Sequence, residues 1–314
     1  MIHRFMLAVA LAAATALPAS AQQKDKDRDR HRDRDRDRDG DYTSTVDTVL
    51  PLSRNGAVDV HLMSGNINVT GWTRNEVRVY GTTERGEIRV EGTASRVEIG
   101  DRTPRGRRGD TELEITVPEG TRLTINGHST DVSVRGVKGE VEIATTNGDL
   151  IIDNATSRVA FESVSGDVQV SRVQGELRGE AMSGEVDVTD VSGDVEVETV
   201  SGDLTLRNVR SKYVRAESVS GSVEFEGRTE PQGRYDFASH SGDVRLILPA
   251  ALGATISVET FSGTIDSDFP IVLQPGDRHG KQFQFQVGDG GARIDATSFS
   301  GGIYIQRGMG RDRE

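Results

Sequence analysis

Cysteine is absent from the 314-residue sequence, and aromatic residues are scarce. Without cysteine the chain has no disulfide, no thiolate nucleophile and no sulfur ligand for a metal, so it has to fold without covalent cross-links. Aromatic side chains make up 5% of the residues. An enzyme that cleaves glycans is expected to carry aromatic platforms for its sugars, so this scarcity weighs against that class. Trp72, the only tryptophan, is expected to pack over one end of the fold.

Motifs that carry catalysis are missing too. The sequence has no pair of histidines at metal-ligand spacing, no Gly-x-Ser-x-Gly segment and no glycine loop of the phosphate-binding kind. Histidines after residue 21 are scattered: His31, His61, His128, His240 and His279. His240 stands where a related segment carries valine, and we expect it to be a core substitution that points inward. We assign no catalytic, cofactor-binding or metal-ligating residue, expect no cofactor, and predict that the chain is not an enzyme.

One enzymatic alternative stays open. Folds of the β-helix kind host polysaccharide lyases and hydrolases, and a pair of carboxylates on a groove cleaves a glycan by acid–base chemistry. The alternative, a β-helix polysaccharide-active enzyme, rests on analogy between folds alone. Carboxylates are too numerous in this sequence to single out a pair, so no residue is named for it.

The distribution of charge argues against nucleic acid as a partner. Residues 22–41 hold eight basic and eight acidic residues, and Arg4 is the one Lys, Arg, Asp or Glu before them. Residues 42–314 therefore carry 29 basic and 42 acidic side chains. Proteins that bind phosphate backbones use clustered Lys and Arg, whereas this region has an acidic excess. The one basic cluster, at 103–110, is expected to be a solvated loop between strands.

The first 41 residues precede the region with strand patterns. Arg4, an apolar run over 5–16 and small residues at 19–21 have the layout of a secretory signal peptide, so we expect residues 1–21 to be cleaved. No later run of about 18 apolar residues offers a transmembrane anchor. Residues 22–41 alternate basic and acidic side chains with nothing apolar to bury, which predicts a disordered tether. These features predict a periplasmic or secreted protein.

A nine-residue repeat dominates the rest of the chain. Aligned segments beginning at Val186, Val195 and Leu204 carry apolar side chains at their first, third and sixth positions. Alternating apolar and polar residues are typical of a strand with one buried face, and the Ser-Gly-Asp that ends a unit is typical of a turn. Ser-Gly or Asn-Gly pairs recur eighteen residues apart, at Asn147, Ser165, Ser183 and Ser201. Each unit is therefore predicted to be a short strand followed by a turn.

Units of this length have to stack, because burying three apolar side chains does not offset the entropy of ordering nine backbones. We predict an all-β domain at 42–306 that is a β-solenoid of about nine-residue strand-turn units. Within it we expect less regular N-terminal rungs and a cap at 42–125, then regular repeats at 126–306. A loop insertion is expected near 274–282, and a flexible tail at 307–314. An antiparallel β-barrel or sandwich is the alternative, since nine-residue spacing also suits hairpins.

Several segments identify the repeat more closely: SVSGDVQV, TVSGDLTL, SHSGDVRL, SFSGGIYI and, at 117–125, VPEGTRLTI. They resemble the bacterial β-strand-repeat family labelled "putative adhesin", a domain of unknown function, over most of residues 55–306. The resemblance implies a right-handed β-helix-like fold outside the cytoplasm, and it brings no catalytic or ligand residue onto this sequence. We predict a non-enzymatic, exported, adhesin-like protein whose partner is a protein or glycan of the cell envelope or extracellular surface.

A calcium-binding alternative comes from the acidic turns. If the turns stack, the following side chains form a column of carboxylates about 5 Å apart: Asp149, Asp167, Glu185 and Asp203. The calcium-binding β-roll has three glycines in each nine-residue unit, whereas this repeat has one. Calcium also takes six to eight oxygen ligands, which one carboxylate per turn does not supply. We expect no metal site and keep a calcium-binding, β-roll-like secreted protein as an alternative.

Overall fold

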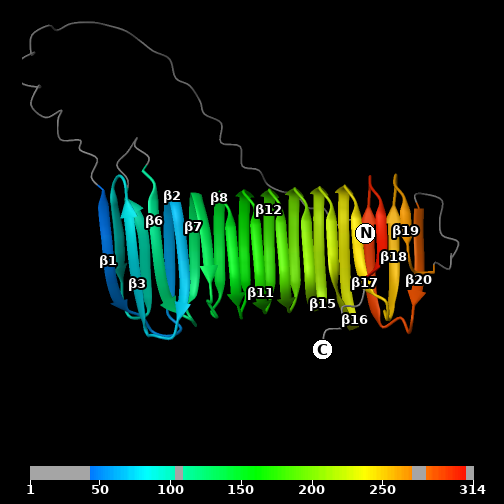
Figure 1. The fold of residues 1–314 in the computed structure, drawn as a ribbon, viewed down its shortest axis with the longest axis horizontal. Helices are drawn as coiled ribbons and strands as arrows, with labels where there is room; N and C mark the ends of the chain where they lie inside the picture. The colour runs from blue at the N-terminus through cyan, green and yellow to red at the C-terminus, as the bar shows by residue number, and fades with distance from the viewer. Residues whose placement is uncertain (1–42, 103–108, 271–280, 309–314) are drawn as a thin grey trace, which may run out of the picture. The chain divides into compact units, whose positions relative to one another are not determined.

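A computed structural model describes residues 43–102, 109–270 and 281–308, all within the compact unit Asp41–Glu314. These residues form strands joined by turns, and no helix occurs among them (Figure 1). The strands are β1 (Ser44–Pro51), β2 (Ala57–Trp72), β3 (Glu76–Thr83), β4 (Glu87–Gly92), β5 (Arg96–Arg102), β6 (Thr111–Pro118), β7 (Arg122–Arg135), β8 (Val141–Asn147), β9 (Leu150–Ala155), β10 (Val159–Ser165), β11 (Val168–Gln174), β12 (Leu177–Ser183), β13 (Val186–Ser192), β14 (Val195–Ser201), β15 (Leu204–Ser220), β16 (Val223–Ser241), β17 (Val244–Pro249), β18 (Ala254–Thr260), β19 (Ile265–Ser267), β20 (Lys281–Val287), β21 (Ala292–Ser298) and β22 (Ile303–Gly308).

Several expectations concern residues outside the described ranges. The signal peptide at 1–21 and the tether at 22–41 lie there entirely. Most of the basic segment at 103–110, of the insertion at 274–282 and of the tail at 307–314 lies there as well.

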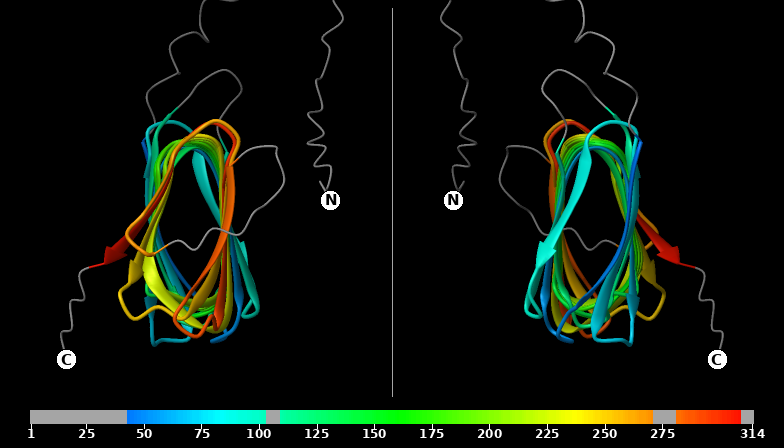
Figure 2. Two further views of the ribbon diagram at one scale, coloured as in Figure 1. Left: turned by 90° about the vertical axis from the view of Figure 1, so that its right-hand side faces the viewer. Right: turned by 90° about the vertical axis from the view of Figure 1, so that its left-hand side faces the viewer.

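Each strand in the middle of the domain pairs with the strand that comes second after it in the chain. β8, β10, β12 and β14 pair in parallel on one face, and β9, β11 and β13 pair in parallel on the other. A rung is a pair of strands, one from each face. Val168 lies opposite Val186, so the register advances by eighteen residues from one rung to the next. Figure 2 shows the two faces enclosing one core. Equivalent residues of successive repeats therefore form columns.

The predicted β-solenoid, a right-handed β-helix-like stack of equivalent nine-residue units, is wrong in that form. The described strands join into one continuous 22-stranded sheet, which closes around the core as a flattened, barrel-like wall with outer strands added (Figure 2). Closure into a barrel belongs to the alternative prediction. That alternative also predicts antiparallel strands, but among the described strands antiparallel pairing is confined to four pairs near the ends: β1–β3, β3–β6, β4–β5 and β18–β20. Local repeats specify strands and turns, but they do not specify how a sheet closes and ends.

The two strands of a rung are not equivalent, although their sequences look alike. In the unit from Val186 the first, third and sixth residues are buried, because the fifth, Asp190, has a φ of 59° and reverses the side-chain alternation. In the unit from Val195 the buried residues are the first, third and fifth. The left-handed residues form a column with φ between 53° and 59°: Asn154, Arg172, Asp190 and Asn208. The structural repeat is therefore eighteen residues long, with two unlike halves.

Small hydroxyl side chains line the core beneath the Ser-Gly turns. Thr260 Oγ1 donates to the Gly301 carbonyl at 3.1 Å, and Ser239 Oγ donates to the Gly221 carbonyl at 2.9 Å. Each of these hydroxyl groups is the fifth residue of its unit and is almost completely buried. A buried hydroxyl without a partner is costly, and these bonds tie each hydroxyl to the turn of a neighbouring rung, so they stabilise the turns from inside.

Spacing between Ser-Gly pairs widens where β15 and β16 run alongside each other, and the two strands are correspondingly long. Tyr235 holds this wider part together. Its hydroxyl donates to the Ser211 carbonyl at 2.5 Å and accepts from the Glu230 backbone N–H at 2.7 Å. Burial raises the pKa of Tyr235, and its ring packs against Phe225 with centroids 6.1 Å apart. The extra residues of this wider part are therefore fixed by buried contacts.

Each end of the sheet contains a rung that is out of sequence order. At the N-terminal end, β2 lies between β7 and the strands β5 and β6. At the other end, β21 lies between β16 and β18, and β22 lies between β17 and β19. The order of rungs in space therefore differs from the order of strands in the chain at both ends.

We expect Val197→Asp and Gly202→Val each to destabilise the domain by roughly 3 kcal/mol or more, and Glu196→Lys to have little effect. Val197 is fully buried, so a carboxylate there has no partner. Gly202 has a φ of 144°, and a Cβ there would lie 1.9 Å from the Gly184 carbonyl oxygen of the preceding rung. Thermal unfolding followed by circular dichroism measures the three variants. Equal melting temperatures would contradict the register.

Asn208→Val is expected to lower the free energy of unfolding by about 1–2 kcal/mol more than Asn208→Gly does. Asn208 has a φ of 53°, which a β-branched residue disfavours and glycine tolerates. Both variants lose the bond from Asn208 Nδ2 to the Asp190 carboxylate, so their difference isolates the backbone effect. Urea unfolding gives the two free energies. If the valine and glycine variants are equally stable, the left-handed residues do not determine which side chains of the strand face the core.

Candidate binding surface

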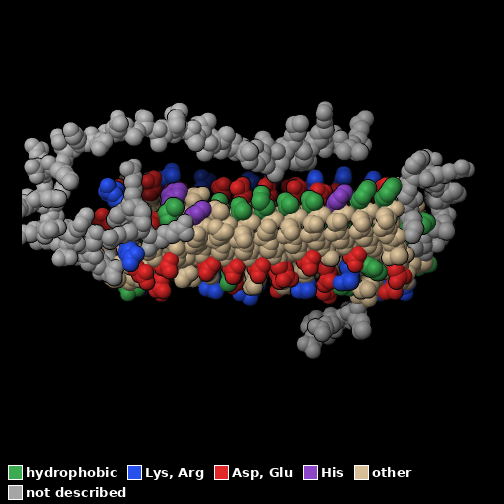
Figure 3. Space-filling view, turned by 90° about the horizontal axis from the view of Figure 1, so that it is seen from above, with side chains coloured by type: hydrophobic (Ala, Val, Ile, Leu, Met, Phe, Trp, Pro, Cys, Tyr) green, Lys and Arg blue, Asp and Glu red, His purple; other side chains and the backbone are tan. Residues whose placement is uncertain are grey.

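The candidate surface is the long edge at which Ser-Gly turns join the two faces, called here the top edge. Figure 3 shows a row of apolar side chains, a strip of backbone and small polar residues, and a row of acidic side chains along it. The residue before each Ser-Gly pair supplies the apolar side chain, and the residue after it supplies the acidic one in most rungs. The eighteen-residue register aligns both rows along the stack.

The apolar row faces solvent. We define it by seven residues in spatial order: Val164, Met182, Val200, Val219, His240, Phe299 and Phe261. Its Val, Met and Phe side chains are between 43% and 63% exposed. The interpretation of His240 as an inward-pointing core substitution is therefore wrong. Ser239 occupies the buried place before it, and the histidine points outward.

Three stacked rings form the C-terminal part of the apolar row. The His240 and Phe299 rings lie with centroids 4.8 Å apart and a 9° angle between planes. Phe299 and Phe261 follow with centroids 5.1 Å apart and a 2° angle. The ordering comes from the insertion of β21 between β16 and β18, which places Phe299 between residues that precede it in the sequence. Sequence neighbours alone do not reveal this stack.

The acidic turn residues hold successive turns together. Asp149 Oδ1 accepts the Asp167 backbone N–H at 3.0 Å, and Asp167 Oδ1 accepts the Glu185 backbone N–H at 2.9 Å. Asp203 Oδ1 accepts the Ser222 backbone N–H at 2.8 Å in the same way. These carboxylates therefore accept hydrogen bonds from the backbone of the neighbouring turn. In the described parts of the chain, no three His, Asp or Glu side chains are grouped so as to hold a metal ion.

A second acidic row, called here the glutamate row, flanks the apolar row on the opposite side. It consists of Glu162, Glu180, Glu198 and Glu217, which lie opposite one another in successive strands. Arg215 partly compensates it, with Nε 3.0 Å from Glu217 Oε1 and 3.5 Å from Glu198 Oε1. Burial, together with the charge of Glu217, raises the pKa of Glu198. The row retains an excess of negative charge.

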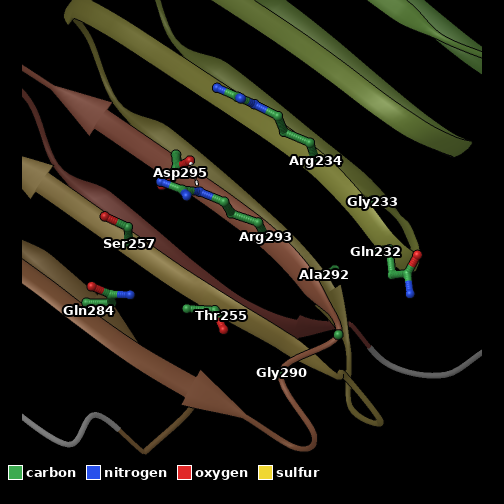
Figure 4. A pocket seen from close by; sticks show the side chains of 11 residues that line it. Gln232, Gly233, Arg234, Thr255, Ser257, Gln284, Gly290, Ala292, Arg293 and Asp295 are labelled. Carbon is green, nitrogen blue, oxygen red and sulfur yellow. Dashed lines mark hydrogen bonds and ion pairs between the residues drawn. The ribbon is translucent and has the colours of Figure 1, made fainter. Parts of the chain in front are cut away.

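A polar cleft of about 420 Å³ lies on the face formed by β16, β21, β18 and β20 (Figure 4). Arg293 Nε donates to Asp295 Oδ2 at 2.8 Å, and Arg234 Nε donates to Asp236 Oδ2 at 2.8 Å. Each guanidinium therefore has its own carboxylate. The lining also includes hydroxyl and amide groups, from Thr255, Ser257 and Gln284. Since the arginine charges are compensated in place, the cleft is a weak site for an anion.

Of the remaining residues singled out in the sequence, His128 precedes Ser129, which pairs with Asn147, so it lies in the column of the apolar row two rungs before Val164. Trp72 lies at the end of β2, where Nε1 donates to the Glu76 carbonyl at 2.8 Å and the Arg74 guanidinium lies 5.0 Å from the ring centroid. It packs against its own turn. His31 and His279 lie outside the described residues.

Sequence reasoning missed the apolar row because it treated the sixth residue of every unit as core. The signal is the fifth residue. Where this is Ser, Thr or Ala, as in Ser163, Ala181 and Thr199, it takes the buried place and the sixth residue is exposed.

No helix in the described ranges is long and apolar enough to cross a membrane. A family model, Toastrack DUF4097, matches residues 42–197 and 108–306, which confirms the resemblance that the repeats indicate. No curated protein matches the sequence.

Solved bacterial structures with similar chains carry adhesion-related names. A "putative adhesin" from Bacteroides fragilis NCTC 9343 is 15% identical, with 83% of this chain and 97% of that chain covered and a TM-score of 0.43. A "putative cell adhesion protein" from Clostridium sporogenes ATCC 15579 is 13% identical, with 84% and 100% covered and a TM-score of 0.23. A "putative adhesin" from Parabacteroides merdae ATCC 43184 is 11% identical, with 66% and 89% covered and a TM-score of 0.31.

We expect Asp203→Ala to lower the free energy of unfolding by about 1 kcal/mol, and Asp203→Asn to lower it by less. Asparagine keeps an oxygen that accepts the Ser222 N–H, whereas alanine does not. Glu185→Ala is the matched control, since among the described residues its carboxylate accepts no backbone N–H. Urea unfolding measures all three.

The same preparation tests the calcium alternative. Millimolar calcium is expected to leave the melting temperature of the unsubstituted protein unchanged. A clear rise that disappears in Asp203→Ala would assign the turn carboxylates to calcium.

Proposed function

The chain belongs to the Toastrack DUF4097 family, and we propose that it is a non-enzymatic, exported, adhesin-like protein that binds another component of the cell envelope or extracellular surface. Binding occurs over a rigid β surface rather than in a closed pocket. The partner is a protein or glycan of that compartment. The adhesion-related names of the similar structures belong to those proteins and fit the same class.

The observation that carries the proposal is the apolar row. Val200 is 43% exposed and Val219 is 51% exposed, and they stand in neighbouring rungs of one exposed line. A single exposed valine is ordinary on a protein surface, whereas a contiguous exposed apolar patch marks an interaction site. Because the residues are aligned by the backbone register, the row is available without any rearrangement of the fold.

The chemistry of the polar cleft supports binding over catalysis. Glycan hydrolysis uses two carboxylates with different protonation states, placed on either side of the scissile bond. In the polar cleft, Asp295 is the one acid among the described lining residues, and it is bonded to Arg293. The sequence adds no nucleophile motif and few aromatic residues. These features favour recognition of an intact partner.

Export completes the proposal. Residues 1–21 have the layout of a signal peptide, and residues 22–41 alternate charges without apolar residues. We propose that the first segment directs export and that the second tethers the β domain in the periplasm or outside the cell.

A photo-crosslinking amino acid tests this function in the full chain, expressed in the envelope of a bacterial host. Placed at Ser183, on the top edge, it is expected to give a discrete adduct with an envelope or extracellular component. Placed at Gln169, an exposed residue on a flat face, it is expected to give none. Retention of the protein in the cytoplasm, or the absence of any adduct from the top edge, would contradict the proposal.

A further inference from the structure

We propose that the top edge binds a cationic amphipathic helix of a partner protein, with the apolar stripe of that helix on the apolar row and its Lys and Arg side chains on the acidic rows. This inference rests on the proposed function and adds the chemistry of the partner. It follows from three properties of the top edge: its length, its spacing and its charge.

The length of the apolar row fits one helix. Seven rungs, from Val164 to Phe261, are separated by six strand spacings of about 4.8 Å each, so the row is roughly 29 Å long. The distances of 4.8 Å and 5.1 Å between the stacked rings of His240, Phe299 and Phe261 agree with that spacing. A helix rises about 1.5 Å per residue, so about 19 residues span the row. That is an ordinary length for an amphipathic binding segment.

The spacing of the row favours a helix over an extended strand. Residues on one side of a helix recur with each turn, about every 5.4 Å, which is close to the 4.8 Å between rungs. Residues on one side of a strand recur about every 6.6 Å, so they fall out of step with the rungs after two or three contacts. A helix lying along the row therefore places one apolar side chain near each rung over several turns.

Charge on both sides of the apolar row selects a basic helix. Glu162 and Glu180 lie on one side, two residues before Val164 and Met182. Turn acids such as Glu185 lie on the other side, across the strip of small residues (Figure 3). Lys and Arg have apolar stems and charged ends, so they reach outward from an apolar stripe on either side. Two acidic rows around an apolar one match that pattern.

The same charges disfavour a second copy of this chain as the occupant. Two top edges packed face to face bring the glutamate rows and turn acids of one copy against those of the other, and like charges at close range repel. A basic helix meets the opposite condition. Its binding is expected to weaken with salt, because exposed charge pairs are screened.

The test measures binding of labelled model peptides to the full chain by fluorescence anisotropy. The probe is a 20-residue helix of leucine and lysine with its leucines on one side. One reference replaces every lysine by glutamate, and another has the same composition with leucine and lysine alternating. We expect the basic helix to bind at least tenfold more tightly than either reference.

Variants locate the site on the protein. Met182→Ser, Val200→Ser and Val219→Ser together are expected to weaken binding of the basic helix at least tenfold. The matched control replaces exposed apolar residues elsewhere: Val49→Ser, Tyr80→Ser and Ile151→Ser. It is expected to leave binding unchanged. All these residues are at least partly exposed, and unchanged melting temperatures confirm that the variants are folded.

A second pair of variants isolates charge. Glu162→Gln, Glu180→Gln and Glu185→Gln together are expected to weaken binding about tenfold at low salt, and much less at 0.5 M salt. Glu91→Gln, Glu114→Gln and Glu142→Gln remove the same net charge at other exposed positions and are expected to have little effect. Equal losses of affinity in the two triple variants would show that binding depends on net charge alone, and would overturn the inference.

Other outcomes overturn it as well. Equal or tighter binding of the alternating peptide would assign the edge to an extended partner. Sedimentation that shows a dimer, lost in the Met182, Val200 and Val219 variant, would assign it to a second copy. An adduct at Ser183 in cells, with no selective peptide binding, would leave the proposed function standing and remove only the helical partner.

Discussion

The structure depends on one interaction above all: the parallel hydrogen bonding of each turn to the corresponding turn of the next rung. Gly184 donates its N–H to the Ser201 carbonyl at 3.2 Å, and Gly202 donates to the Ser220 carbonyl at 3.1 Å. This ladder leaves no room for a Cβ at the glycine, since the neighbouring turn already occupies that space. Because of this ladder, residues at the same position in successive repeats also lie above one another. Core, turn, apolar row and acidic row are each a column of one kind of residue.

Strands and turns of the repeat were predictable because their signals are local. Alternation gives the buried face of a strand, and Ser-Gly gives the turn, whatever lies further along the chain. The closure of the sheet was not predictable in the same way. The segment around Ser300 resembles every other Ser-Gly unit, so nothing in it indicates that its strand inserts between β16 and β18. Long-range order among similar units is decided by packing at the ends.

The apolar row was misread for a different reason, which concerns one dihedral angle. Asp190 adopts a left-handed conformation and turns Val191 inward, whereas Thr199 stays extended and leaves Val200 outside. Both units read as apolar at the sixth position. The distinction was nevertheless present in the sequence, because Asp or Asn at the fifth position favours the left-handed conformation and Thr does not. Arg172 occupies the same column without that preference, which shows that the stack can impose the conformation.

The out-of-order rungs at the two ends also affect how the chain is assembled and taken apart. β2 is made early, yet its neighbours β5, β6 and β7 are all made after it. β21 and β22 are made last, yet they fill a place between strands made before them. The wall therefore does not grow by simple addition from one end as the chain emerges. Once closed, it also resists unzipping, because pulling on the last strands removes an interior rung and separates two interfaces at once.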